Sequence, residues 1–228
     1  MTVPFTVSGT ATGGGTDYSI TASPVVITAG NTTADITITI TQDSQYENDE
    51  TVIVDMGTPT NATQGAVITH TVTINDDDVA PSVTFTSASQ STGDESAQDY
   101  TITAELSSVS GMDVTVPFTV NAASTATGGS TDYSITASPL TITAGTPSAD
   151  IIVTIATDGE IEDDETVIVD MGTPTNATLG ATTSHTLTIT DDDSGGGPTV
   201  TVCVSPAGDF TTIQDAICLL YTSDAADE

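Results

Sequence analysis

The sequence predicts an all-β protein built from two similar β-sandwich domains. Apolar and polar residues alternate over short segments, as in residues 34–40, where Ile36, Ile38 and Ile40 share one face. The apolar residues are mostly Val, Ile and Ala, Thr is abundant and Trp is absent, a composition that favours strands over helices. An internal repeat then indicates that the same unit occurs twice.

Three motifs define this repeat. VPFTV at residues 3–7 recurs at 116–120, TDYSITASP at 16–24 recurs at 131–139, and DMGTPTNAT at 55–63 recurs at 170–178. A period of about 115 residues is the size of a whole domain rather than of a solenoid unit. We therefore predict domains at residues 1–78 and 79–193. Because Met1 aligns with Val114, the first copy is expected to lack its opening strand.

Each copy contains several short strands separated by turn signals. Val52, Val54 and Met56 alternate with polar residues, and so do Val72 and Ile74. Gly-rich and Pro-containing segments at residues 13–15, 29–31 and 58–60 separate these strands. No helical period is present, so a sandwich of two sheets is expected.

Charge excludes several classes of partner. The chain of 228 residues has no Lys or Arg and 32 Asp plus Glu, with a formal net charge of -32. Binding to nucleic acid or to anionic membranes depends on basic residues, so neither is expected, and no apolar run is long enough to span a membrane. Divalent cations are the natural partners of such a chain.

A family resemblance rests on motifs that occur in the same order in both copies. The first copy reads GTATGGGTDYSI, ITAGNTTADITITI, ENDETVIV and HTVTINDDD. This order resembles the Calx-beta domain, the module of sodium-calcium exchangers and of integrin β4, over residues 1–193. The resemblance implies tandem immunoglobulin-like sandwiches that bind calcium at one tip, among loops and strand ends.

Carboxylates in these loops are the candidate calcium ligands. Calcium takes about six to eight oxygen ligands, so a site needs several carboxylates from different segments. In the second copy we predict Glu95, Asp132, Asp158, Glu162, Glu165, Asp191, Asp192 and Asp193. The first copy offers Asp17, Asp43, Glu47, Glu50, Asp76, Asp77 and Asp78. It has no counterpart of Glu95, so its site is expected to be incomplete.

The alternative interpretation of these acids is a solvated acidic surface. The concentration of Asp and Glu in corresponding loops favours ligation. No enzyme active site is expected, because the clustered carboxylates lack an aromatic platform for a sugar and the Gly-rich segments precede no helix. His70 and His185 share the phase of inward residues and are expected to be packed or at the rim.

The last part of the chain has a different character. After a Gly-rich linker at residues 194–198, the segment PTVTVCVSPAGDFTTIQDAI resembles the opening of right-handed parallel β-helix proteins such as pectinesterases and pectate lyases. We therefore expect residues 199–217 to begin such a domain. Residues 218–228 resemble a translated sequencing adapter and are interpreted as an artefact.

Two functions remain open from the sequence. The first is a calcium-rigidified spacer and adhesion region of a large secreted or cell-surface bacterial protein, whose ligand would be a polysaccharide or a cell surface. The second is the accessory region of an extracellular polysaccharide-active β-helix enzyme. Both place the chain outside the cell.

Overall fold

The structure is a computed structural model that describes residues 1–92 and 94–193. Its regular elements within those ranges are strands. In this part of the chain, no helix has the length and the apolar character that crossing a membrane requires. The predicted linker at 194–198, the predicted β-helix segment at 199–217 and residues 218–228 lie outside the described residues.

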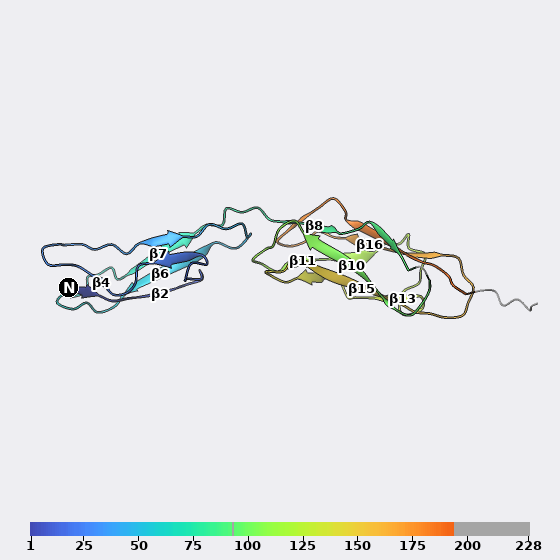
Figure 1. The fold of residues 1–228 in the computed structure, drawn as a ribbon, viewed down its shortest axis with the longest axis horizontal. Helices are drawn as coiled ribbons and strands as arrows, with labels where there is room; N and C mark the ends of the chain where they lie inside the picture. The colour runs from blue at the N-terminus through green and yellow to red at the C-terminus, as the bar shows by residue number, and fades with distance from the viewer. Residues whose placement is uncertain (93, 194–228) are drawn as a thin grey trace, which may run out of the picture.

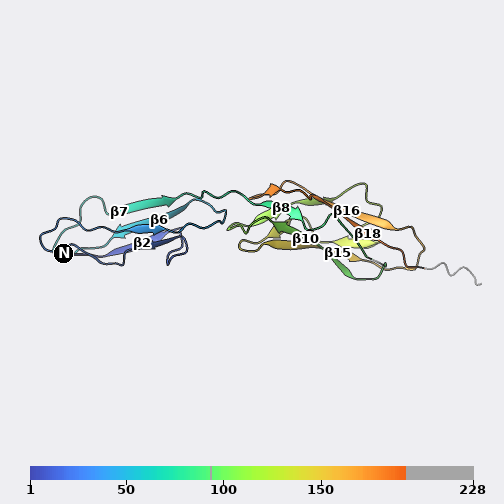
Figure 2. The ribbon, with the colours of Figure 1, turned by 45° about the horizontal axis from the view of Figure 1, so that its top comes forward.

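The second domain is a sandwich of two sheets with the orders β13-β15-β10-β8-β17 and β12-β16-β18-β9 (Figures 1 and 2). The first sheet contains β8 (Ser82–Phe85), β10 (Asp99–Leu106), β13 (Tyr133–Ile135), β15 (Ser148–Ile155) and β17 (Thr178–Leu179). The second contains β9 (Ser89–Ser91), β12 (Phe118–Val120), β16 (Glu165–Met171) and β18 (Ser184–Ile189). A two-stranded ribbon pairs β11 (Val114–Val116) with β14 (Leu140–Ile142). The predicted all-β sandwich is confirmed in this domain.

The first domain repeats part of this plan. Its strands are β1 (Thr2–Val3), β2 (Phe5–Gly9), β3 (Tyr18–Ile20), β4 (Val25–Val26), β5 (Ile38–Ile40), β6 (Glu50–Met56) and β7 (Thr69–Ile74). They form a three-stranded sheet β2-β6-β7 and two pairs, β3-β5 and β1-β4. Residues 1–78 align with residues 114–193, and they contain no counterpart of β8, β9 or β10.

One predicted strand is shorter than expected. Alternation predicts a strand over residues 34–40, but only Ile38–Ile40 form β5, which pairs with β3. The equivalent segment of the second domain is the eight-residue strand β15, which pairs with β10 along seven residues. A strand needs a hydrogen-bonding neighbour, and the first domain has no counterpart of β10.

The core of the second domain lies between its sheets. Ile102 and Ala104 of β10 pack with Ile151 of β15 and Val167 of β16, and all four are at most 1% exposed. Alternation along each strand places every second side chain inside, as the sequence predicts. In the first domain the buried apolar side chains are Val3, Phe5, Tyr18, Val52 and Val54.

The two domains lie end to end (Figure 1). The backbone carbonyl of Tyr46, in the first domain, accepts hydrogen bonds from the Gly111 amide at 3.0 Å and from Ser110 Oγ at 3.3 Å. Tyr46 and Ser110 also form an isolated parallel β-bridge. The loop between β5 and β6 of the first domain therefore contacts the loop between β10 and β11 of the second.

Candidate metal centres

Asp132, Glu162 and Glu165 form one carboxylate cluster of the second domain, which we call the Asp132 cluster. One oxygen from each residue lies within 4.8 Å of the others. The three side chains come from the turn before β13, the loop after β15 and the first residue of β16. Convergence of separate segments is what a multidentate cation site requires.

Local hydrogen bonds hold this cluster in place. The Thr127 amide donates to Asp132 Oδ2, and the Asp132 carbonyl accepts a hydrogen bond of 2.8 Å from the Ala156 amide. Glu165 pairs with Ile189 in the ladder between β16 and β18, so its backbone belongs to the sheet. The carboxylate of Asp132 and the backbone of Glu165 are therefore held in place by the fold itself.

The Asp132 cluster destabilises its own negative charge. Burial, a hydrogen bond with Asp132 and the charges of Asp132, Glu162 and Glu95 raise the pKa of Glu165 from 4.5 to about 7. With no Lys or Arg in the chain, no basic side chain offsets this repulsion. The cluster therefore binds a proton more readily than a free carboxylate does.

Glu95, Asp158 and Asp193 form a second cluster, the Glu95 cluster, again with one oxygen from each within 4.8 Å of the others. Glu95 is only 4% exposed, which makes it one of the few buried charged residues among those described. Burial and the charges of Asp158, Glu162, Asp191 and Asp193 raise its pKa. The charge of Glu162 acts on Glu95 and that of Glu95 on Glu165, so the two clusters are electrostatically linked.

The first domain has an equivalent of the Asp132 cluster. Asp17, Glu47 and Glu50 again place one oxygen each within 4.8 Å of the others. As in the second domain, the Thr12 amide donates to Asp17 Oδ2 and the Asp17 carbonyl accepts from the Thr41 amide at 2.8 Å. Burial and the charge of Asp17 raise the pKa of Glu50.

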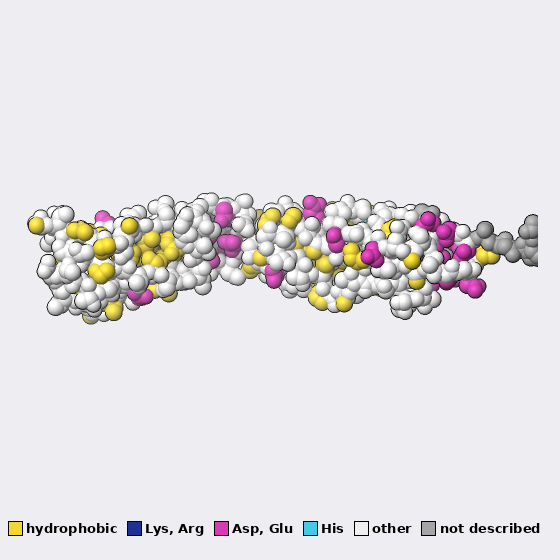
Figure 3. All heavy atoms as spheres, turned by 60° about the horizontal axis from the view of Figure 1, so that its bottom comes forward, with side chains coloured by type: hydrophobic (Ala, Val, Ile, Leu, Met, Phe, Trp, Pro, Cys, Tyr) yellow, Lys and Arg dark blue, Asp and Glu magenta, His cyan; other side chains and the backbone are white. Residues whose placement is uncertain are grey.

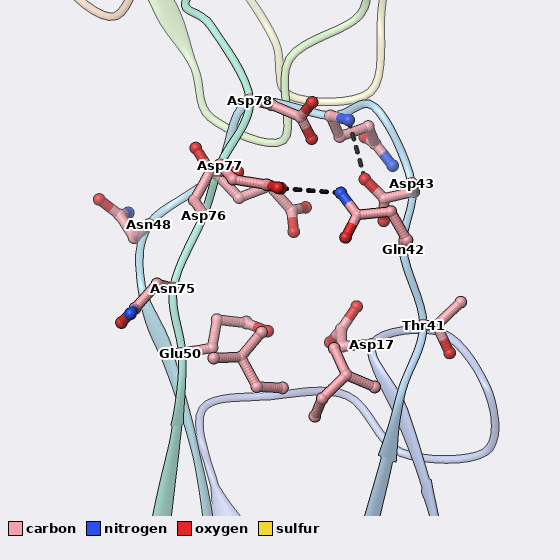
Figure 4. Close-up of a pocket in the computed structure, with 14 residues that line it drawn as sticks. Asp17, Thr41, Gln42, Asp43, Asn48, Glu50, Asn75, Asp76, Asp77 and Asp78 are labelled. Atoms are coloured by element: carbon pink, nitrogen blue, oxygen red, sulfur yellow. Dashed lines mark hydrogen bonds between the residues drawn. The ribbon is translucent and has the colours of Figure 1, made fainter.

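This Asp17 cluster faces a pocket of about 60 Å³. Figure 4 shows Asp17 and Glu50 on opposite sides of its lower part, with Asp43, Asp76 and Asp77 above them. The pocket lies beside the junction, since a side chain at Gly111 of the second domain would collide with Glu47.

The remaining predicted ligands lie around these clusters. Asp191 is near enough to Glu95, Glu162 and Asp193 to raise the pKa of each. Asp192 is exposed and belongs to neither cluster. Asp43, Asp76, Asp77 and Asp78 line the pocket of the first domain without joining its triad. The described residues contain no first-domain equivalent of the Glu95 cluster.

Gln42, which lines the first-domain pocket, and Asp49, which lies outside its lining, have a supporting role that the sequence analysis did not predict. Gln42 donates from Nε2 to Asp77 at 2.7 Å, and Asp49 Oδ1 accepts a hydrogen bond of 3.0 Å from the Asp76 amide. Gln42 is uncharged and gives no signal in a search for acids. Asp49 lies in the acidic run ENDE, so its position in sequence was the one available hint.

The family follows from comparison with known domains. The family model of the Calx-beta domain matches residues 1–78 and residues 76–193. The chain belongs to the Calx-beta family. The resemblance to Calx-beta domains in two copies is thereby confirmed, and the two sandwiches are Calx-beta domains.

Several solved structures are similar to this chain. The apo-form Calx CBD1 domain is 18% identical, with a TM-score of 0.45, over 50% of this chain and 100% of that one. CBD12 from CALX1.2 is 18% identical, with a TM-score of 0.41, over 82% and 86% of the two chains. The calcium binding domain CBD12 of CALX1.1 is 21% identical, with a TM-score of 0.36, over 96% and 80%. No curated protein matches the sequence significantly.

The donor set of the clusters is compatible with a hard cation. Every side chain in the three triads is a carboxylate, and Ca²⁺ prefers oxygen ligands. The acidic clusters of these Calx-beta domains could therefore hold ions.

Proposed function

We propose that both Calx-beta domains bind calcium at their carboxylate clusters, and that the chain is a calcium-rigidified spacer and adhesion region of a secreted or cell-surface bacterial protein. The observation that carries the proposal is the convergence of carboxylates into triads, two of which include a buried member, in a chain without Lys or Arg. One similar structure, CBD12 of CALX1.1, is a calcium binding domain, which is consistent with the proposal.

Electrostatics supports this assignment. Carboxylates within 4.8 Å of one another repel, and the repulsion is strongest where water is excluded, as at Glu95. A bound divalent cation reverses the sign of the interaction. Calcium should therefore bind the folded state in preference to the unfolded chain and stabilise it.

Thermal unfolding of the full chain in chelator and in millimolar calcium tests the proposal. Calcium at about a hundredfold excess over its dissociation constant should add roughly 2.7 kcal/mol to the free energy of unfolding. Magnesium should add less, because it favours a smaller octahedral shell and releases its water reluctantly.

A matched pair of variants locates the effect. Replacing Asp158, Glu162 and Glu165 together by Ala should abolish the response of the second domain. Asp150→Ala should retain it, because the Asp150 side chain is exposed on β15, belongs to none of the three triads and accepts a hydrogen bond from Thr103 Oγ1. Identical melting curves in calcium and in chelator would mean that the acidic loops are only a solvated surface.

The spacer role is supported by the end-to-end arrangement and by the position of the Asp17 cluster beside the junction. Small-angle scattering of the full chain should give a narrower range of lengths in calcium than in chelator. The same distribution under both conditions would count against rigidification. Secretion is tested separately, by fractionating a bacterium that expresses the parent gene.

A second candidate is the accessory region of a polysaccharide-active β-helix enzyme. It is favoured by the segment FTTIQDAI, at residues 210–217. The parent gene distinguishes the candidates, because a complete β-helix with an acidic cleft supports the enzyme and many further Calx-beta copies support the spacer.

A further inference from the structure

The loop between β15 and β16 of the second domain contains Asp158 followed directly by Gly159. It is the one Asp-Gly sequence of the chain, which contains no Asn-Gly. The loop leaves β15 at Ile155, which pairs with Tyr133 of β13, and so lies at the end of the domain away from the first domain (Figure 1). Figure 3 shows acidic side chains gathered at this end.

An Asp-Gly sequence can undergo isomerisation of its aspartate. The backbone nitrogen of Gly159 attacks Cγ of Asp158, a C–N bond forms, and one carboxyl oxygen leaves as water, which gives a succinimide ring. Water then adds to the ring and breaks one of its C–N bonds. When the bond to the backbone carbonyl carbon of Asp158 breaks, the main chain runs through Cγ, as isoaspartate. The water lost in the first step is regained in the second, so no further reactant is needed.

The structure leaves Gly159 accessible for this reaction. Asp158 and Gly159 are both exposed and lie outside the strands. A Cβ atom at Gly159 would meet no atom within 4 Å, and among the described residues its backbone N–H has no hydrogen-bond partner. Asp158 Oδ1 accepts a hydrogen bond of 2.8 Å from the Glu160 amide. This bond holds the carboxyl group beside the peptide unit of Gly159, where the attack occurs.

The first domain contains the same turn without the glycine. Asp43 Oδ1 accepts a hydrogen bond of 2.8 Å from the Gln45 amide (Figure 4). Asp43 and Ser44 are exposed, as their counterparts Asp158 and Gly159 are. The two turns therefore differ at the attacking residue. A Ser side chain hinders the approach of the backbone nitrogen, whereas glycine has no Cβ atom to do so.

We propose that Asp158 is a modification site that isomerises spontaneously to isoaspartate, and that calcium in the Glu95 cluster suppresses the reaction. The part about calcium rests on the proposed function. Asp158 shares that cluster with Glu95 and Asp193, with one oxygen from each within 4.8 Å of the others. A carboxylate that binds a cation stays deprotonated, whereas the oxygen that leaves as water has to be protonated first. Calcium therefore holds Asp158 in its unreactive form.

Isomerisation removes the ligand that calcium protects. In isoaspartate the main chain is one carbon atom longer and the carboxylate is attached directly to Cα, so it is displaced from Glu95 and Asp193. The hydrogen bond between Asp158 Oδ1 and the Glu160 amide is lost as well. A chain kept without calcium therefore loses the Glu95 cluster through a covalent change.

Ageing of the full chain at neutral pH tests the proposal. One sample is kept in chelator and one in millimolar calcium. Chymotryptic digestion, chromatography and electron-transfer fragmentation then measure isoaspartate at each position. In chelator, isoaspartate should form at Asp158 at least tenfold faster than at Asp43. Calcium should slow the reaction at Asp158 at least fivefold.

Reciprocal variants assign the reaction to the glycine. Gly159→Ala should slow isomerisation at Asp158 at least fivefold and leave the fold intact, because the added Cβ atom meets no other atom. Ser44→Gly should accelerate isomerisation at Asp43 at least fivefold. After equal ageing in chelator, calorimetric titration should show one fewer tight calcium ion for the parent chain and the full number for Gly159→Ala.

Two results in chelator would overturn the modification site: equal rates at Asp158 and Asp43, or an unchanged rate at Asp158 in Gly159→Ala. Equal rates in calcium and in chelator, in a chain whose fresh sample binds calcium by calorimetry, would overturn the protection while the proposed function stands. A fresh chain that binds no calcium would refute the proposed function and the protection together. The rates in chelator would still decide whether Asp158 isomerises.

Discussion

The two domains carry nearly the same segment, ADITITI at residues 34–40 and ADIIVTI at residues 149–155, in two different structural states. In the second domain the segment belongs to the eight-residue strand β15 with a buried apolar face. In the first domain three residues form β5 and Ile40 is 43% exposed. Alternation of apolar and polar residues therefore allows a segment to form a strand. The neighbouring strand decides how many of its residues pair and how deeply its apolar side chains are buried.

The same comparison applies to the carboxylates. Both domains have the Asp132 type of cluster, formed by the turn before one strand, the next loop and the start of a Glu-Thr-Val-Ile-Val strand. Only the second has the Glu95 type among the residues described, because Glu95 lies between β9 and β10 and residues 1–78 include no equivalent of that segment. The segment that supplies β8 and β10 to the core thus also supplies a candidate ligand.

The largest expected difference between the domains concerns matched core positions. Ile151→Ala should lower the free energy of unfolding of the second domain by about 2–5 kcal/mol, because it leaves a cavity at a fully enclosed position. Ile36→Ala in the first domain should cost about 1 kcal/mol or less, because its side chain borders an open groove. Denaturant-dependent hydrogen exchange, followed on peptides from each domain, measures both values. Equal losses at the two positions would mean that the groove is closed in solution.

The histidine pair should show a smaller difference. His185→Ala removes a buried ring and its contact with the Ser87 carbonyl, which should cost about 1–3 kcal/mol. His70→Ala should change stability by about 0.5 kcal/mol or less, since His70 is exposed. Urea titration of both variants checks the prediction. A larger effect at His70 would contradict the comparison.

The third prediction concerns a variant of the second domain that lacks Glu95, the acid with no equivalent in residues 1–78. Glu95→Gln removes the buried charge of the Glu95 cluster and should weaken one calcium site at least tenfold, equivalent to about 1.4 kcal/mol. Calorimetric titration should then show one fewer tight ion per chain. Asp99→Asn, at an exposed residue of β10, serves as the control. An unchanged affinity together with an unchanged stoichiometry would exclude Glu95 as a ligand.

The smallest expected effect is the pH dependence of binding at the Asp132 cluster. Glu165 has a pKa of about 7 in the folded, ion-free chain and 4.5 as its ordinary value, so the folded state holds the proton more tightly. Stability without calcium should therefore be greatest below pH 4.5 as far as Glu165 is concerned and should fall as pH rises through 7.

Calcium competes with that proton, so its affinity should fall in the opposite direction, by about twofold from pH 8 to pH 7. Titrations at the two pH values measure this ratio, with Glu165→Gln as the control that removes it. An affinity that rises on acidification would contradict the assigned role of Glu165.

Much of the architecture could be predicted from sequence alone. The alternating Val residues of ETVIV mark β6 and β16, because a pleated strand turns every second side chain to the same face. The repeat of TDYSITASP places β3 and β13 at equivalent points. Loop carboxylates were recognisable as one set, since Asp and Glu recur in corresponding loops of both copies.

Other features required the folded chain. The division of the second-domain acids into two triads depends on which loop oxygens lie within 4.8 Å of one another, and sequence separation says little about that. Gln42 supports Asp77 across 35 residues, and Tyr46 accepts a hydrogen bond from Gly111 across the domain junction. These contacts involve uncharged groups or backbone atoms that leave no pattern in the sequence.

The sequence by itself determined the local state of each segment: its strand period, its turns and the charge it carries, because these follow from neighbouring residues. Tertiary structure alone decided burial. Ile36 and Ile151 occupy equivalent positions in equivalent patterns, yet one borders a groove and the other is enclosed. The physical reason is that removing an apolar side chain from water needs partners on every side, and for Ile151 those partners arrive from β10, a strand about 50 residues away in the chain.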